Sequence, residues 1–260
     1  MTAKLSELLQ QGQSVWLDSI RRKSLLDGEM AELIAGGVRG ETANPTIFEK
    51  ALSTSDYDSE IRVLAKQGKS ANEIYETLLV KDVQTACDLF RRLYDESDGA
   101  DGFVSLEVSP KLALDTQGTI SEVRRFWEWV SRPNLMVKIP GTKEGVPAIE
   151  QMVYEGVNVN ITLLFGIEAY EAVAWAYVHA LERRAAQGQP VHRIASVASF
   201  FVSRIDTLAD KLLEERIKSN GDPHKFEELK SLEGRAAIAN AKLAYESFQK
   251  IFGSQEFRAL

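Results

Sequence analysis

The chain has 260 residues, with 31 lysines and arginines against 38 aspartates and glutamates, and a formal net charge of −7. An acidic chain binds nucleic acid poorly, and 44% hydrophobic and 27% charged residues are ordinary proportions for a globular protein. No apolar run approaches the roughly 20 residues of a membrane helix, and the N-terminus lacks the apolar core of a secretory signal. We therefore expect a cytoplasmic protein with neither a nucleic-acid nor a membrane partner.

The single cysteine and the three histidines give no sign of metal chemistry. Cys87 lies in a helical pattern without a histidine nearby, so we expect a buried thiol in the core rather than a nucleophile. His179, His192 and His224 share no spacing typical of a metal site. The glycine motifs of dinucleotide folds and P-loops are missing as well. We expect neither a metal nor another cofactor.

Six short apolar runs bounded by turn residues predict β-strands. In chain order they are residues 15–20, 38–44, 102–109, 134–140, 156–165 and 194–201. Helical periodicity predicts helices at 25–35, 61–94 with a break near Gly68, 119–130, 145–154, 167–186 and 226–252. Strands and helices alternate without a linker or a change of composition, which predicts a single α/β domain over residues 1–260.

The direction of the strand side chains separates the two folds that have this alternation. Helices cover both faces of a doubly wound sheet, whereas they cover only the outside of a barrel, whose inner face can be polar. Three strands have one apolar face, formed by Val104, Leu106 and Val108, by Leu135, Val137 and Ile139, and by Val157, Val159, Ile161 and Leu163. Polar residues on their other faces favour the barrel.

The C-terminal part of the chain predicts that this barrel is incomplete. A typical barrel has eight strands in about 250 residues. Only six runs can be counted, and the residues after Arg204 have a helical pattern as far as Phe252, without a β-branched run. We expect a (β/α)8 TIM barrel truncated after about six strands, with the C-terminal strand–helix units missing.

Polar residues of the inward face gather at the C-terminal ends of the strands, where active sites of such barrels lie. They are Asp18, Asn44, Glu107, Lys138, Asn160, Thr162 and Ser199. Lys138 is the one lysine embedded in an apolar strand, and an apolar interior favours a neutral amine, which attacks carbonyl groups to form a Schiff base. Glu107 and Asp18 could move protons, and the two amides could hold the hydroxyls of a polyol.

Each of these residues also has a purely structural interpretation. Lys138 could be held by Glu107 in an ion pair. Asn44 precedes Pro45 and could be the N-cap of a helix, and Asp18 could equally be a cap. The functional interpretation depends on the shared direction of these side chains on successive strands, rather than on any one of them.

Five segments resemble, in order, the strand motifs of the transaldolase family. They are TANPTIF at 42–48, VSLEVS at 104–109, VKIPGT at 137–142, NVNITLLF at 158–165 and SFFVSRI at 199–205. The resemblance implies transfer of a dihydroxyacetone unit from sedoheptulose 7-phosphate to glyceraldehyde 3-phosphate, giving erythrose 4-phosphate and fructose 6-phosphate, in the pentose phosphate pathway. It implies sugar phosphates as partners and no cofactor, and it leaves the oligomeric state open.

The resemblance assigns the chemistry to four residues. Lys138 would form the Schiff base. Asp18 would take the proton from the C4 hydroxyl of the donor during carbon–carbon cleavage. Glu107 and Thr162 would handle the water that is released and consumed with the imine.

The same resemblance assigns substrate binding to four others. Asn44, Asn160 and Ser199 would bind donor hydroxyls, and Arg204 would bind the phosphate, because a planar guanidinium contacts two phosphate oxygens at once. The sequence departs from the family pattern at Phe200, where proline is usual, and at Ala43, where serine or threonine is common. We interpret both as subfamily variation.

Two alternatives remain open. The smaller fructose 6-phosphate aldolases resemble residues 138–145 as well, but they typically have glutamine at the position of Glu107 and tyrosine near that of Phe201. The second alternative is a catalytically weak, truncated barrel that acts as a binding module. The presence of Asp18, Glu107 and Lys138 together argues against it.

Overall fold

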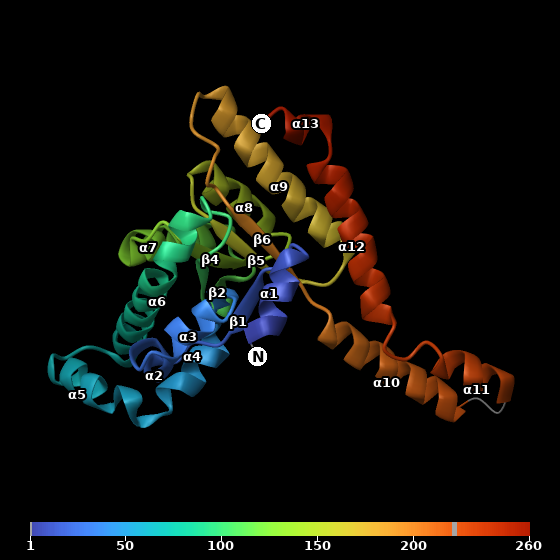
Figure 1. Cartoon of the computed structure of the whole chain (residues 1–260), viewed down its shortest axis with the longest axis horizontal. Helices are drawn as coiled ribbons and strands as arrows, with labels where there is room; N and C mark the ends of the chain where they lie inside the picture. The colour runs from blue at the N-terminus through green and yellow to red at the C-terminus, as the bar shows by residue number, and fades with distance from the viewer. Residues whose placement is uncertain (1, 220–222) are drawn as a thin grey trace.

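The computed structural model describes residues 2–219 and 223–260, and at its centre a parallel sheet curls into an arc (Figure 1). The strands are β1 (Val15–Asp18), β2 (Val38–Thr42), β3 (Phe103–Glu107), β4 (Leu135–Pro140), β5 (Val159–Leu164) and β6 (Ser196–Phe200). They lie in sequence order, and each neighbouring pair is parallel. All six predicted strands form. Within the described residues β1 and β6 do not pair with each other, so the arc is open between them.

Helix α1 precedes β1, helices follow every strand along the chain, and those between β1 and β6 lie around the outside of the arc (Figure 1). They are α1 (Thr2–Gln10), α2 (Arg22–Leu26), α3 (Glu29–Ala35), α4 (Pro45–Leu52), α5 (Asp58–Lys66), α6 (Ala71–Glu96), α7 (Thr116–Val130), α8 (Gly145–Tyr154), α9 (Ile167–Ala186), α10 (Ser203–Ser219), α11 (Pro223–Lys230), α12 (Ala236–Phe252) and α13 (Gln255–Arg258). The short 3₁₀ turns η1 (Ser55–Tyr57) and η2 (Pro110–Leu112) complete the elements. None of the described helices is long and apolar enough to cross a membrane.

Glycines with positive φ divide three of the predicted helices. Residues 25–35 form two helices separated at Gly28, which has φ +97°. The predicted break at Gly68, with φ +79°, is confirmed and separates α5 from α6. Gly234, with φ +68°, lies between α11 and α12, so residues 226–252 are not one helix. Only glycine adopts this conformation without a steric penalty, which explains the breaks at Gly28 and Gly68, whereas Gly234 lies four residues beyond the end of α11 and just before the N-cap of α12.

The apolar strand faces form the core against the helices, as predicted. The predicted residues on β3 and β4, and those from Val157 to Ile161, are at most 3% exposed. Leu163 was predicted on the same face, and that prediction is wrong. The register shifts between Ile161 and Leu164, Leu163 takes φ +62° and is 40% exposed, and Leu164 is buried in its place. A bulge of this kind moves one side chain to the other face.

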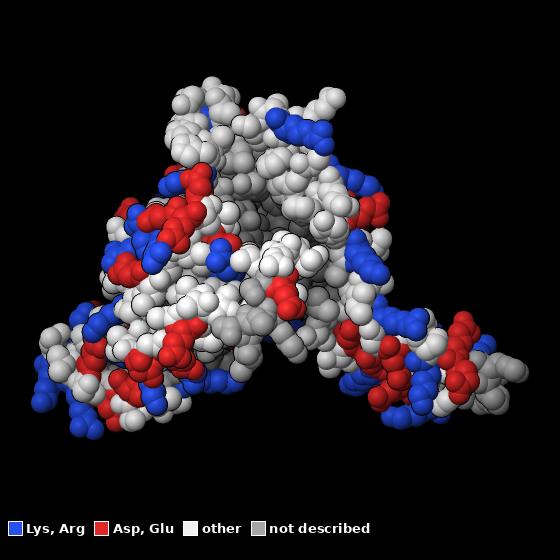
Figure 2. Space-filling model, in the orientation of Figure 1, with Lys and Arg blue, Asp and Glu red and all other residues white. Residues whose placement is uncertain are grey.

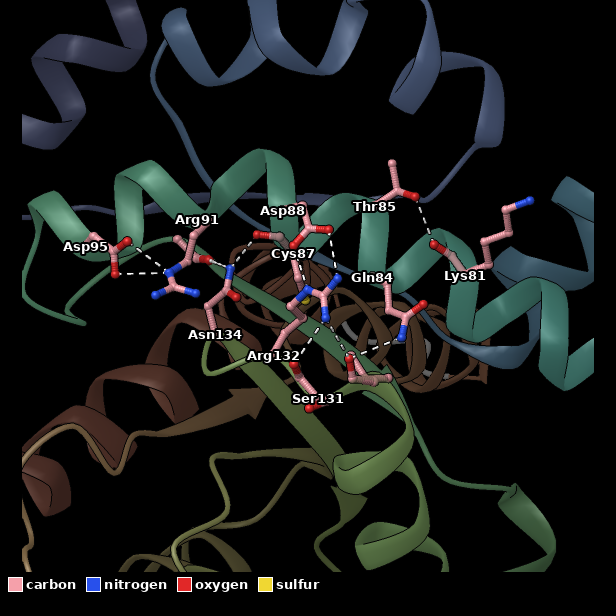
Figure 3. Close-up of polar contacts among 12 residues, drawn as sticks. Lys81, Gln84, Thr85, Cys87, Asp88, Arg91, Asp95, Ser131, Arg132 and Asn134 are labelled. Carbon is pink, nitrogen blue, oxygen red and sulfur yellow. Dashed lines mark hydrogen bonds and ion pairs between the residues drawn. The ribbon is translucent and has the colours of Figure 1, made fainter.

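Polar contacts bind α6 to the turn that leads from α7 into β4 (Figure 3). Asn134 Nδ2 donates to the carbonyl oxygens of Cys87 and Gly102, each at 2.9 Å. The Arg132 guanidinium binds both carboxylate oxygens of Asp88, at 2.6 and 3.0 Å. Cys87 is fully buried, as predicted, and its burial raises the pKa of the thiol. These contacts hold the helix behind β3 and β4, the strands of the candidate site.

The described C-terminal residues after Arg204 form helices joined by turns at 231–235 and 253–254, which confirms the predicted helical pattern, but these helices do not form one layer. Helices α10 and α11 project from the body, and α12 returns along α9 (Figure 1). Between α12 and the outer face of β6 lies a groove of about 550 Å³, lined by residues that include Ala198, Phe200, Tyr245 and Phe248. Figure 2 shows a recess here whose visible walls carry few charged groups.

Candidate active site

The centre of the candidate site is a pair of side chains on the inner faces of β3 and β4. Glu107 and Lys138 are register partners, and Lys138 Nζ lies 3.2 Å from Glu107 Oε2. The Lys138 side chain is 8% exposed and the Glu107 side chain is 12% exposed. The ion pair that the structural interpretation anticipated is therefore present. The same contact is also suited to proton transfer, because the Lys138 ammonium becomes a nucleophilic amine only after its proton has moved to an acceptor.

Burial raises the pKa of Glu107 above its usual range, while the Lys138 ammonium opposes this rise and the charge of Asp18 adds to it. Asp18 ends β1, where its side chain is exposed and its register partner is Thr42. Its effect on Glu107 puts the two carboxylates within electrostatic reach across the interior of the arc. A carboxyl group with a raised pKa holds its proton more readily than an ordinary carboxyl group, which suits a general acid–base.

A chain of hydrogen bonds crosses the inner face beside this pair. Asn160 on β5 is the register partner of Lys138 and is 2% exposed. Its Oδ1 accepts a hydrogen bond from Ser199 Oγ on β6 at 2.8 Å, and its Nδ2 donates to Ser105 Oγ on β3 at 2.9 Å. The structure thus brings together Asn160 and Ser199, which the sequence predicted. It adds Ser105, which shares the inward direction of Glu107 but was not selected.

Thr162 lies one step further along β5. It is 1% exposed and opposite Pro140, and its carbonyl accepts a hydrogen bond from the Gly141 amide at 2.8 Å. The next residue, Leu163, has φ +62°. A non-glycine residue in this conformation is strained, and such strain occurs often at functional sites.

Asn44 and Arg204 lie at the margin of this group. Asn44 Oδ1 accepts the Ile47 amide at 2.9 Å, so the N-cap interpretation is confirmed, and Asn44 also lines a small void with Glu107. Arg204 is exposed at the start of α10, with Cζ 4.7 Å from the centre of the Phe201 ring. Among residues 2–219 and 223–260, no carboxylate lies within 4.0 Å of its guanidinium.

A cavity of about 740 Å³ opens on the inner face of the arc. Its wall includes Met136, Asn160 and Ser199 but not Lys138 or Glu107, and it extends past Ser14 and Arg193 toward the N-terminal ends of the strands. The part of the chain that the structure describes holds no group of three His, Cys, Asp or Glu side chains placed to bind a metal. The arrangement thus offers a buried amine, a carboxylate beside it, and amide and hydroxyl groups beside an open cavity, which together suit a carbonyl substrate with several hydroxyls.

Comparison with known proteins relates the sequence of this chain to a family. The family model described as transaldolase/fructose-6-phosphate aldolase matches residues 15–257. The chain is 47% identical over 262 residues to a transaldolase of Trichodesmium erythraeum and to transaldolase 2 of Nostoc punctiforme, with all of this chain and 69% of each relative covered. It is 48% identical over 260 residues to a transaldolase of Saccharopolyspora erythraea, with 99% of this chain and 68% of the relative covered.

Proposed function

Because the chain belongs to the transaldolase/fructose-6-phosphate aldolase family, we propose that it transfers a dihydroxyacetone unit between sugar phosphates through a Schiff base on Lys138. The observation that carries the proposal is the distance of 3.2 Å between the buried Lys138 amine and the Glu107 carboxylate. The donor is sedoheptulose 7-phosphate and the acceptor is glyceraldehyde 3-phosphate. The reaction belongs to the pentose phosphate pathway of the cytoplasm and uses no cofactor.

The proposed reaction begins when the neutral Lys138 amine attacks the C2 carbonyl of the donor. The carbinolamine loses water to give the imine, with Glu107 and Thr162 handling the protons and the water. Asp18 then takes the proton of the C4 hydroxyl, the bond between C3 and C4 breaks, and the aldose phosphate leaves as an aldehyde, while the electron pair of the broken bond stays on the dihydroxyacetone fragment as an enamine. The enamine attacks the acceptor aldehyde, and hydrolysis of the new imine frees the amine.

Substrate binding in this proposal falls to Asn44, Asn160, Ser199 and Arg204. Asn160 and Ser199 are supported by their place on the cavity wall, next to the register position of Lys138. Asn44 is supported by the void that it shares with Glu107. The role of Arg204 is supported by the exposure of its guanidinium, which suits the binding of a phosphate at the rim of the site rather than a buried phosphate.

We further propose that two more strand–helix units complete this domain as a (β/α)8 barrel. The open edges of β1 and β6 support this, since an exposed parallel edge leaves backbone groups without partners. The chain also spans only 69% of the length of its relatives in Trichodesmium and Nostoc. The additional length is in the range needed for two units of about 30 or more residues each.

The activity is tested by incubating the protein with fructose 6-phosphate and erythrose 4-phosphate and identifying the products by mass spectrometry. We expect sedoheptulose 7-phosphate and no free dihydroxyacetone. Lys138→Met should abolish transfer, while Lys143→Met, which changes an exposed lysine near the same strand, should retain it. Free dihydroxyacetone without transfer would indicate the aldolase instead. Transfer that survives Lys138→Met would overturn the proposal.

A further inference from the structure

Ser105 has no part in the proposed reaction, yet it lies at the centre of the site. It precedes Glu107 by two residues on the inner face of β3, and its side chain is fully buried. Its Oγ accepts a hydrogen bond of 2.9 Å from Asn160 Nδ2 on β5. The bond therefore crosses the inner face of β4, whose Met136 is opposite Ser105 and whose Lys138 is opposite Asn160.

This hydrogen bond holds one end of an amide whose other end is also held. Ser199 Oγ donates to Asn160 Oδ1 at 2.8 Å, so the two serines fix the plane of the amide between them. A primary amide has two N–H groups and two acceptor sites. One N–H group and one acceptor site of Asn160 are left for a ligand, beside the cavity that Asn160 lines.

The hydrogen bond is not needed to hold the sheet together. Strands β3 and β5 are not neighbours, and each is already paired to β4 through its backbone. The hydrogen bond instead fixes the orientation of the Asn160 amide. A planar amide that is free to rotate presents its N–H group to a substrate hydroxyl for only part of the time. Fixed polar groups bind a substrate more tightly than mobile ones, since their ordering does not have to occur on binding.

We propose that Ser105 is a positioning residue, which orients the Asn160 amide toward a hydroxyl of the donor bound at Lys138. This inference rests on the proposed function, in which Asn160 binds the donor. Ser105 acts only through Asn160, so removing its hydroxyl should weaken donor binding and leave the chemistry of the amine unchanged. It should also have no further effect once Asn160 itself has been removed.

The test measures how borohydride trapping of the enzyme–donor imine depends on the concentration of fructose 6-phosphate. Ser105→Ala should raise the half-saturating concentration about 10- to 100-fold, the effect of one buried hydrogen bond, with little change in the maximal rate. Ser105→Thr, which keeps the hydroxyl, should retain more of the wild-type affinity. The double variant Ser105→Ala/Asn160→Ala should match Asn160→Ala. The control is Ser24→Ala, a second buried serine, whose Oγ donates to the Arg21 carbonyl outside the barrel interior at 2.9 Å.

The outcomes separate this inference from the proposed function. If the wild-type protein forms no trapped imine, the proposed function is wrong and this inference fails with it. If the wild type is trapped and Ser105→Ala has the same half-saturating concentration, only the positioning role is wrong. Additive effects of Ser105→Ala and Asn160→Ala in the double variant would also overturn the positioning role. Equal increases of the half-saturating concentration in Ser105→Ala and Ser24→Ala would overturn it too, because they would reflect general destabilisation.

Discussion

Glu107 and Asp18 are both carboxylates of the same inner face, but their surroundings differ. Glu107 is buried against Lys138, whereas Asp18 is exposed at the end of β1. We therefore predict that Glu107→Gln and Asp18→Asn fail at different steps. Glu107→Gln should slow imine formation and Asp18→Asn carbon–carbon cleavage, each by about 100- to 10,000-fold. Rapid-quench measurement of both steps separates the two defects, and identical defects would contradict this division of roles.

The sequence identified the site through the direction of its strand side chains. Lys138, Glu107, Asn160 and Ser199 come together because parallel strands in register place alternate residues on one face, which a sequence pattern can show. Ser105 was on the same face and was passed over because a lone serine carries little chemistry. Its role depends on a contact across β4, and such a contact follows from the curvature of the sheet rather than from spacing along the chain.

Glu41 is a second residue whose environment could not be predicted from the sequence, and that environment decides its protonation state. It is fully buried on the helix-facing side of β2, and neither carboxyl oxygen has a hydrogen-bond partner among the described residues. Burial, with a smaller contribution from the charge of Asp82, raises the pKa of Glu41 from 4.5 to about 8. The folded protein therefore holds this group as the neutral acid at neutral pH.

A raised folded-state pKa makes stability depend on pH in one direction. Unfolded Glu41 ionises near pH 4.5 and the folded protein holds its proton until about pH 8, so the free energy of unfolding should fall between these values. The loss should be about 1.4 kcal/mol per pH unit and should level off above pH 8. Urea titrations at several pH values should show this slope in the wild type and not in Glu41→Gln. The same slope in both proteins would contradict it, and the exposed Glu49→Gln serves as control.

At the scale of the elements, helix α6 is held to the chain before it by a buried ionic network. Arg22 donates to Asp82 on α6 at 2.7 and 2.8 Å and to Glu60 at 2.5 Å, and Tyr57 donates to the other oxygen of Asp82 at 2.7 Å. The side chains of Arg22 and Asp82 are 9% and 3% exposed. Removing one member of such a pair leaves the other charge buried and unpaired.

We predict that Asp82→Ala lowers the free energy of unfolding by about 3–5 kcal/mol. The matched control lies on the same helix. Asp88→Ala breaks the bidentate pair with Arg132, but the Asp88 side chain is 56% exposed, so its loss should cost at most about 1 kcal/mol. Urea denaturation of both variants tests this. Equal losses would show that burial does not distinguish the two pairs.

The strands could be predicted because apolar runs between turn residues are a local signal, and their order follows from it. Helix boundaries were harder to predict, because the breaks at Gly28 and near Gly234 involve a positive φ that a glycine permits but does not require. The bulge at Leu163 could not be foreseen, since it depends on how β5 and β6 pair. For helix α4 the sequence indicated only a possible start at Asn44 and Pro45, which is confirmed, and not its extent to Leu52.

At the scale of the whole molecule, the arc keeps the Lys138 site but leaves the inner cavity open between β1 and β6. Arg204 is then the one phosphate-binding residue that we propose. We predict that residues 1–260 carry out transfer only weakly, because a phosphate held by one exposed arginine orients the sugar poorly.

Adding two strand–helix units should restore the transfer rate. A suitable chimera appends the part of the Trichodesmium erythraeum relative that this chain does not cover. Steady-state transfer rates of the two proteins, with size-exclusion chromatography to detect association through the open edges, provide the comparison. Full activity of a monodisperse protein of residues 1–260 would show that the open arc is sufficient.

Borohydride reduction in the presence of fructose 6-phosphate tests whether Lys138 forms the covalent intermediate. Reduction converts the imine into a stable secondary amine, which peptide mass spectrometry assigns to one lysine. We expect a dihydroxyacetone adduct on Lys138 and none in Lys138→Ala. An adduct on Lys111 or Lys143 instead, or no adduct at a saturating concentration of the sugar phosphate, would contradict this expectation.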